Sequence, residues 1–124
     1  MQPLNKGETT VVVKNLTGRY GQEDVLRAWP ADGSYDLVHL PYNLLQKRAL
    51  GYVFINFSTH ELAVSFQQRW HGAMLPDGSN KRPLEVSSAE VQGRQANLEI
   101  IKTRKITQLE KAGYLPMLFE GEER

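Results

Sequence analysis

The stretch LGYVFINF, residues 50–57, constrains the fold of this chain more than any other segment. In a β-strand successive side chains point to opposite faces of the sheet, so Tyr52 and Phe54 would stand together on one face. Val53 and Ile55 would point to the other face, where aliphatic side chains suit a core. Because a core needs only one face, the two aromatic side chains on the opposite face require another explanation.

The period of the apolar residues changes along the chain, and these changes outline six elements. Strands are expected over residues 9–15, 35–40, 51–57 and 83–89, and helices over residues 21–29 and 60–71. Strand, helix, strand, strand, helix, strand is the order of the split βαβ, ferredoxin-like arrangement. The sequence therefore predicts an α+β fold with a four-stranded antiparallel sheet, two helices on one face, and a polar, basic loop over residues 42–49.

Capping residues and apolar stripes support both helices. Gly21 suits the N-cap of the first helix, and Ser58 or Thr59 suits that of the second. Gly72 is expected to end the second helix. That helix is expected to bury Leu62, Ala63, Phe66 and Trp70. The predicted core cluster is Val53, Ile55, Phe57, Phe66 and Trp70.

About 35 residues follow the fourth strand, and they are expected to form a helix and a tail. The helix would run from near Val91 to Gly113, and the apolar tail YLPMLF would dock on the domain. We expect the helix to pack on or beside the sheet face that carries Tyr52 and Phe54. The predicted organisation is a flexible segment 1–8, a core 9–90 and a packed helix and tail 91–124.

Composition excludes several classes of function. The chain has 124 residues, which suits one domain, and no cysteine, which removes disulfides and thiolate metal sites. Its three histidines are scattered, and no paired carboxylates stand at ligand spacing, so neither a metal nor another cofactor is expected. No signal peptide or membrane-spanning run is visible, which favours an intracellular protein, nuclear, cytoplasmic or both. The net charge of +1 limits any nucleic-acid site to a local patch.

Catalysis has little support in the sequence, and we expect no enzyme. The chain contains no P-loop, no Gly-x-Ser-x-Gly and no His-Glu-x-x-His motif. Acylphosphatases share the expected fold and use an arginine in a phosphate-cradling loop after the first strand. Arg19 stands near that place, but its loop lacks the glycine-rich character of a phosphate cradle.

Unpaired nucleobases explain the aromatic pair better. Stacking on an aromatic side chain contributes about 1 to 3 kcal/mol per base, and every base offers a π-face. Packing beneath the C-terminal helix is the plainer alternative. The two interpretations are compatible if that helix moves.

LGYVFINF resembles the octamer of the RNA recognition motif, and VVVKNL, residues 11–16, resembles the hexamer on its first strand. The segments YDLVHLPYN, EVQGRQANLE and YLPMLF resemble the carboxy-terminal RNA recognition motif of the Mei-two-like proteins, regulators of meiosis and differentiation. That resemblance runs from about Thr9 to Phe119. It implies binding of single-stranded RNA through the open sheet face, in post-transcriptional regulation. Two positions depart from the general motif: Val12 replaces an aromatic residue, and Leu50 replaces a basic one.

The expected RNA contacts combine stacking and polar groups. They are Tyr52, Phe54, Lys14, Asn15, Arg48, Gln92 and Arg94. Each polar residue has an ordinary alternative, namely a solvated strand end, loop or helix start. A different class of function stays open as well: a module of this fold that binds a peptide or partner domain through its helical face or its tail.

Overall fold

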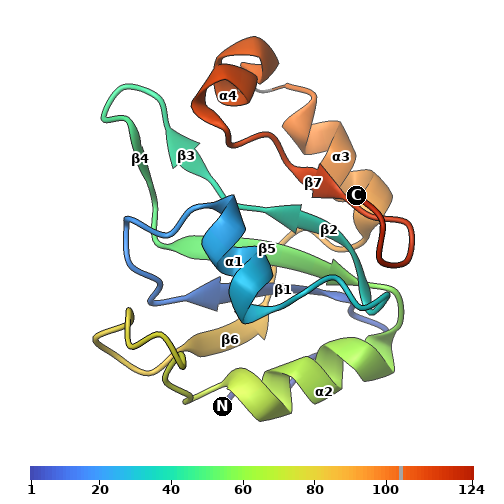
Figure 1. Ribbon diagram of the computed structural model, residues 1–124. Coiled ribbons are helices and arrows are strands. Elements are labelled where there is room, and N and C mark those ends of the chain that lie inside the picture. Colours follow the sequence, from blue (N-terminus) through green and yellow to red (C-terminus); the bar gives the residue numbers. More distant parts are fainter. Residues whose placement is uncertain (104) are drawn as a thin grey trace.

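The computed structural model describes residues 1–103 and 105–124. Five strands form one antiparallel sheet in the order β6-β1-β5-β2-β7 (Figure 1). They are β1 (Thr10–Lys14), β2 (Tyr35–His39), β5 (Tyr52–Phe57), β6 (Glu85–Ser88) and β7 (Met117–Leu118). The helices are α1 (Gln22–Ala28), α2 (His60–Trp70), α3 (Arg94–Ile101) and α4 (Ile106–Ala112). The predicted ferredoxin-like α+β fold is confirmed, with one strand more than expected.

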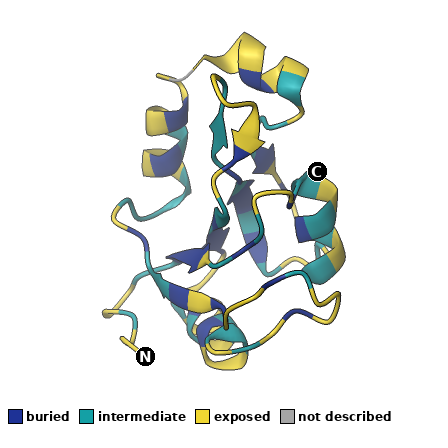
Figure 2. Cartoon of the chain, turned by 90° about the vertical axis from the view of Figure 1, so that its left-hand side faces the viewer, coloured by how far each residue is buried: buried dark blue, intermediate teal, exposed yellow. Residues whose placement is uncertain are grey.

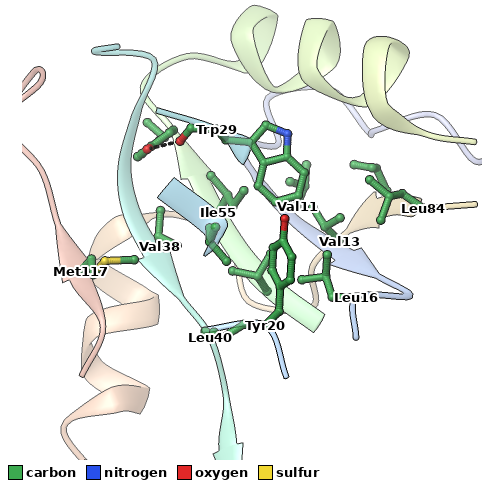
Figure 3. Packing of buried hydrophobic residues seen from close by; sticks show 14 of the residues in the cluster. Val11, Val13, Leu16, Tyr20, Trp29, Val38, Leu40, Ile55, Leu84 and Met117 are labelled. Carbon is green, nitrogen blue, oxygen red and sulfur yellow. Dashed lines mark hydrogen bonds between the residues drawn. The ribbon is translucent and has the colours of Figure 1, made fainter. Parts of the chain in front are cut away.

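The sheet separates two layers of helices. Helices α1 and α2 cover one face, while α3 lies on the other side (Figures 1 and 2). The main core fills the space under α1 and α2, where Val11, Val13 and Ile55 are fully buried (Figure 3). Trp29 closes this core from α1, and its backbone carbonyl accepts a 2.7 Å hydrogen bond from the Tyr35 hydroxyl.

Helix α2 begins and ends as the sequence predicts. The Thr59 hydroxyl caps its first turn by accepting from the Leu62 backbone N–H at 3.2 Å. Gly72 follows the helix with a φ of +83°. In the predicted core cluster, three members from β5 are buried, and Phe66 and Trp70 are partly buried against them. The expectation that Leu62 is buried is wrong, because it lies on the outer face of the helix and is 38% exposed.

Residues 42–49 form a hairpin instead of the predicted loop. Strands β3 (Tyr42–Asn43) and β4 (Arg48–Ala49) pair with each other outside the main sheet. The ring of Tyr42 stacks on Tyr114, with centroids 4.2 Å apart and planes 21° apart. Burial raises the pKa of the Tyr114 phenol, and the nearby Tyr42 raises it further. The hairpin is thereby held against the C-terminal segment.

The single helix expected after β6 is divided into α3 and α4. The Thr103 hydroxyl donates to the Ile100 carbonyl at 2.6 Å, and the Thr103 N–H bonds to the same oxygen at 3.1 Å. Such local bonds compete with the helical pattern and tighten the last turn of a helix. Helix α4 ends at Gly113, the predicted stop, in the left-handed conformation.

The tail forms β7 and closes the edge of the sheet beside β2. Met117 and Phe119 turn into the main core, and the Phe119 N–H bonds to the Asp36 carbonyl at 2.9 Å. The Gln22 side chain on α1 donates to the Leu115 carbonyl. Pairing removes an open sheet edge, which is otherwise a site for aggregation.

Gly51 shows why the octamer carries a glycine. Its φ is +84°, and its carbonyl accepts the Leu16 N–H at 2.9 Å. A side-chain carbon added at Gly51 would stand 2.9 Å from the Leu16 carbonyl oxygen. Only glycine permits this approach of the loop after β1 to the start of β5.

Candidate functional site

The aromatic pair lies on the sheet face opposite α1 and α2. Tyr52 and Phe54 are both partly exposed, and their rings meet edge to face with centroids 5.7 Å apart. Across the neighbouring strand, Lys14 is opposite Tyr52 and Val12 is opposite Phe54. Lys14 is exposed and Val12 is buried. The result is a small aromatic platform with a cation at one end.

A third ring joins the platform from β2. His39 pairs with Phe54 across the strands, and the two rings stack with centroids 6.0 Å apart and planes 27° apart. A β-bulge between Tyr35 and Leu37 makes this possible, because the extra residue changes which side chains face the core. The sequence analysis missed His39 as a site residue, since simple alternation would place it on the same face as Tyr35.

A groove of about 410 Å³ runs between this platform and α3. The sheet supplies one wall, including the platform and Lys14. The other wall is formed by the segment after β6 and by Asn97, Ile100 and Ile101 of α3. Because α3 covers only part of the sheet face, the platform remains open to a ligand.

Gln92 fixes the start of α3 to the sheet. Its side-chain oxygen accepts from the backbone N–H groups of Thr9 and Thr10, both at 2.9 Å. Its side-chain nitrogen donates to the carbonyls of Thr10, at 2.8 Å, and Ala89, at 2.9 Å. Both ends of the Gln92 amide are thus bonded within the chain, and an RNA contact of this residue stays a prediction.

A polar network closes the far half of the same face. The hydroxyls of Thr9 and Thr10 donate to the Asn56 side-chain oxygen at 2.8 and 2.7 Å. The Asn56 side-chain nitrogen donates to Asp36 at 2.8 Å, and the Gly93 N–H donates to the Thr10 hydroxyl at 2.8 Å. Buried polar groups of this kind are tolerated because they are paired. This half of the face is occupied by the chain itself, and the groove lies over the half with Tyr52.

The other predicted contacts, Asn15, Arg48 and Arg94, do not line this groove. Asn15 ends β1 with a φ of +74°, and its side-chain nitrogen donates to the Pro83 carbonyl at 2.8 Å. Together with Lys81 and Arg82 it lines a second hollow beside the end of β1. Arg48 is exposed on β4. Arg94 lies with the tail in a separate hollow, so the structure does not bring it to the groove.

Two further features bear on the class of site. Over residues 1–103 and 105–124, no helix combines the length and the apolar character that a membrane crossing requires. In the same residues, no three histidine or carboxylate side chains gather in a way that could hold a metal ion. Stacking and hydrogen bonding are the chemistry that the groove offers.

Comparison with known proteins agrees with this geometry. The family RNA recognition motif 2 matches residues 8–102. Protein MEI2-like 2 of Oryza sativa subsp. japonica is 27% identical over 98% of this chain, which spans 15% of that protein. The terminal ear1 homolog of Oryza sativa subsp. indica is 28% identical over 90% of this chain and 19% of its own length. The chain thus spans less than a fifth of these curated relatives.

Two solved structures show the same fold. The second RRM domain of the yeast poly(U)-binding protein Pub1 aligns with a TM-score of 0.57 and 21% identity, over 69% of this chain and 99% of that one. The Rna15 RRM with bound RNA (GU) aligns with a TM-score of 0.57 and 17% identity, over 77% of this chain and 97% of that one.

Proposed function

The chain belongs to the RNA recognition motif 2 family, and we propose that it binds single-stranded RNA in the groove between the sheet and α3. The observation that carries the proposal is the pair Tyr52 and Phe54, partly exposed on the face that the main core does not use. Base stacking gives such rings a partner, at about 1 to 3 kcal/mol per base. The related Rna15 domain was solved with RNA bound.

The groove has one positive side chain, Lys14, at the end of β1, and one carboxylate, Glu90, in the opposite wall. Lys14 stands exposed at the groove, and Asn15 follows it at the end of β1. We propose that these two and Arg48 contact phosphates or base edges as the strand leaves the platform. Arg94 stands beside the tail, so we expect it to contribute less.

Exchange of the two platform rings from β5, Tyr52 and Phe54, tests the proposal directly. Tyr52→Ala with Phe54→Ala should weaken binding of a short single-stranded RNA by about 2 to 6 kcal/mol, taking about 1 to 3 for each lost stack. The readout is a fluorescence titration of labelled RNA. Because the main core lies on the opposite face, the double variant should still fold.

The matched control removes apolar surface from the other side of the molecule. Leu62 and Met74 are exposed, at 38% and 51%, and neither lines the groove. Leu62→Ala with Met74→Ala should leave RNA affinity unchanged. A folded platform variant that binds RNA as tightly as the unmodified protein would exclude the sheet as the RNA site.

Salt dependence separates this function from its rival, a peptide-binding module. RNA affinity should fall with salt, with a logarithmic slope of about 0.7 for each phosphate contacted. A peptide held in the hollow on the helical side, which Trp29 and Trp70 line, would respond weakly to salt. Binding that is insensitive to salt and to the platform exchange would favour the rival.

The biological setting of the RNA site is a proposal of the same kind. The relatives are MEI2-like and terminal ear1 proteins, and their full chains are several times longer than this one. We propose a role in post-transcriptional regulation of the kind that controls meiosis or differentiation, in the nucleus or the cytoplasm, where RNA is available.

A further inference from the structure

Asn97 of α3 lines the groove, and its side-chain oxygen has no hydrogen-bond donor among the described residues. The residue is only 9% exposed and lines the groove opposite the aromatic platform. Its side-chain nitrogen donates to the Gly93 carbonyl at 2.7 Å and to the Val91 carbonyl at 3.2 Å. Carbonyls only accept hydrogen bonds, so the NH₂ group must face them and the amide cannot be turned the other way.

The side-chain oxygen of Asn97 is the atom that remains. Among the residues that the structure describes, none donates to it. It does not belong to the polar atoms sealed from solvent without a partner, so it is still reachable. A polar side chain buried to this degree is normally bonded at both ends. Water can satisfy this accessible oxygen, and a donor on a bound ligand can take the place of that water.

The position of this oxygen is set by the sheet. Both carbonyls that hold the Asn97 amide flank Gln92, and the Gln92 amide is bonded to the backbone of β1. Since β1 pairs directly with β5, the acceptor stands in a fixed relation to Tyr52 and Phe54. A site built on bonded elements in this way can hold a ligand group to the accuracy that recognition requires.

We propose that Asn97 is a specificity-determining residue that accepts a hydrogen bond from the exocyclic amine of a base stacked on the platform. Adenine and cytosine carry an amine on the edge where uracil and guanine carry a carbonyl. A carbonyl there would bring two acceptors face to face, so adenine, through N6, and cytosine, through N4, should be preferred. The amine of guanine, N2, lies at a different place on the base. This inference rests on the proposed RNA binding and specifies which bases that groove selects.

The sharpest test changes the RNA and leaves the protein intact. Short oligoadenylate is compared with the same oligomer in which purine riboside, which lacks only the amine, replaces adenosine. The unmodified protein should lose about 3- to 10-fold in affinity, the contribution of one neutral hydrogen bond. Oligocytidylate should also bind more tightly than oligouridylate.

Asn97→Ala connects this preference to the residue. The variant should bind the two adenine-type oligomers equally, whereas a merely structural role would weaken both and keep their ratio. Gln95→Ala is the matched control, because Gln95 is exposed on the same helix, does not line the groove, and its side chain donates to Glu99 at 2.9 Å. It should keep the full ratio.

Each result decides between the possibilities. Equal affinity of the unmodified protein for the two oligomers would overturn the role of Asn97, even if Asn97→Ala fails to fold, and RNA binding itself would stand. A ratio that survives in folded Asn97→Ala would also overturn it. If no single-stranded RNA binds at all, this inference fails together with the proposed function.

Discussion

The two faces of the central sheet are built from alternate residues of the same strands, yet they are closed in different ways. The face under α1 and α2 is closed by apolar packing, with Val11, Val53 and Ile55 fully buried. The opposite face is closed over one half by hydrogen bonds around Gln92 and Asn56, and it stays open over the other half. Apolar packing supplies stability on one face. On the other, hydrogen bonds together with the buried Val12 and Ile101 position a wall and leave room for a ligand.

Truncation in the packed face should have the largest effect on stability. Phe57 is 3% exposed, and its ring lies 5.0 Å from that of Phe66. Phe57→Ala should lower the free energy of unfolding by about 3 to 5 kcal/mol, through lost burial and a cavity. Denaturant unfolding measures this. A loss below about 1 kcal/mol would mean that apolar packing under α1 and α2 is not the main source of stability on that face.

Removal of the Gln92 amide should have the next largest effect. Gln92→Ala would remove the acceptor of the backbone N–H groups of Thr9 and Thr10, whereas their carbonyls keep bonds from the Phe57 and Ala89 N–H groups. We expect a loss of about 2 to 3 kcal/mol in the free energy of unfolding, since unpaired polar groups cost about 1 to 3 kcal/mol each when buried. Faster hydrogen exchange in α3 should accompany it. Gln95→Ala should change neither measurement.

Alkaline pH should destabilise the packed face through its phenols. Burial, and then the charge of Asp32, raises the pKa of Tyr35 to about 12, and burial also raises the pKa of Tyr20, with the hydrogen bond to Asp77 adding to it. The folded state therefore favours the protonated phenols. The two phenols contribute fully to the free energy of unfolding below about pH 10. This contribution is lost as pH rises through their pKa values in the folded state.

For Tyr35 alone, the loss should reach about 1.4 kcal/mol near pH 11, where the unfolded phenol is ionised and the folded one is not. Unfolding free energies measured across this range provide the test. Tyr35→Phe should be less sensitive to alkaline pH than the unmodified protein. An equal sensitivity of both would show that Tyr35 is not the group responsible.

The smallest effect is expected at the charged end of the open face. Lys14→Ala should lower RNA affinity slightly and reduce the logarithmic salt slope by about 0.7, one phosphate contact. The matched control is Lys102→Ala at the end of α3, where Lys102 pairs with Glu99 at 3.3 Å. It should leave the salt slope unchanged. An unchanged salt slope in Lys14→Ala would mean that the bound RNA does not pass the end of β1.

Local patterns in the sequence determined the six core elements. The alternation of β5, the cap at Thr59 and the stops at Gly72 and Gly113 depend on neighbours a few residues away, so they can be read directly. The same alternation put Tyr52 and Phe54 on one face. Gly51 also follows from the octamer pattern, although the close approach that explains it is visible only in the structure.

Only the tertiary structure decided how the open face is finished. The bulge that brings His39 to Phe54, the pairing of β7 with β2 and the break between α3 and α4 carry no periodic signal. The roles of Gln92 and Asn97 could not be read either, because Gln92 bonds to Thr10, 82 residues away along the chain. A hydrogen-bond partner that far along the chain depends on how the sheet and α3 pack together. The residues next to Gln92 in the sequence do not indicate it.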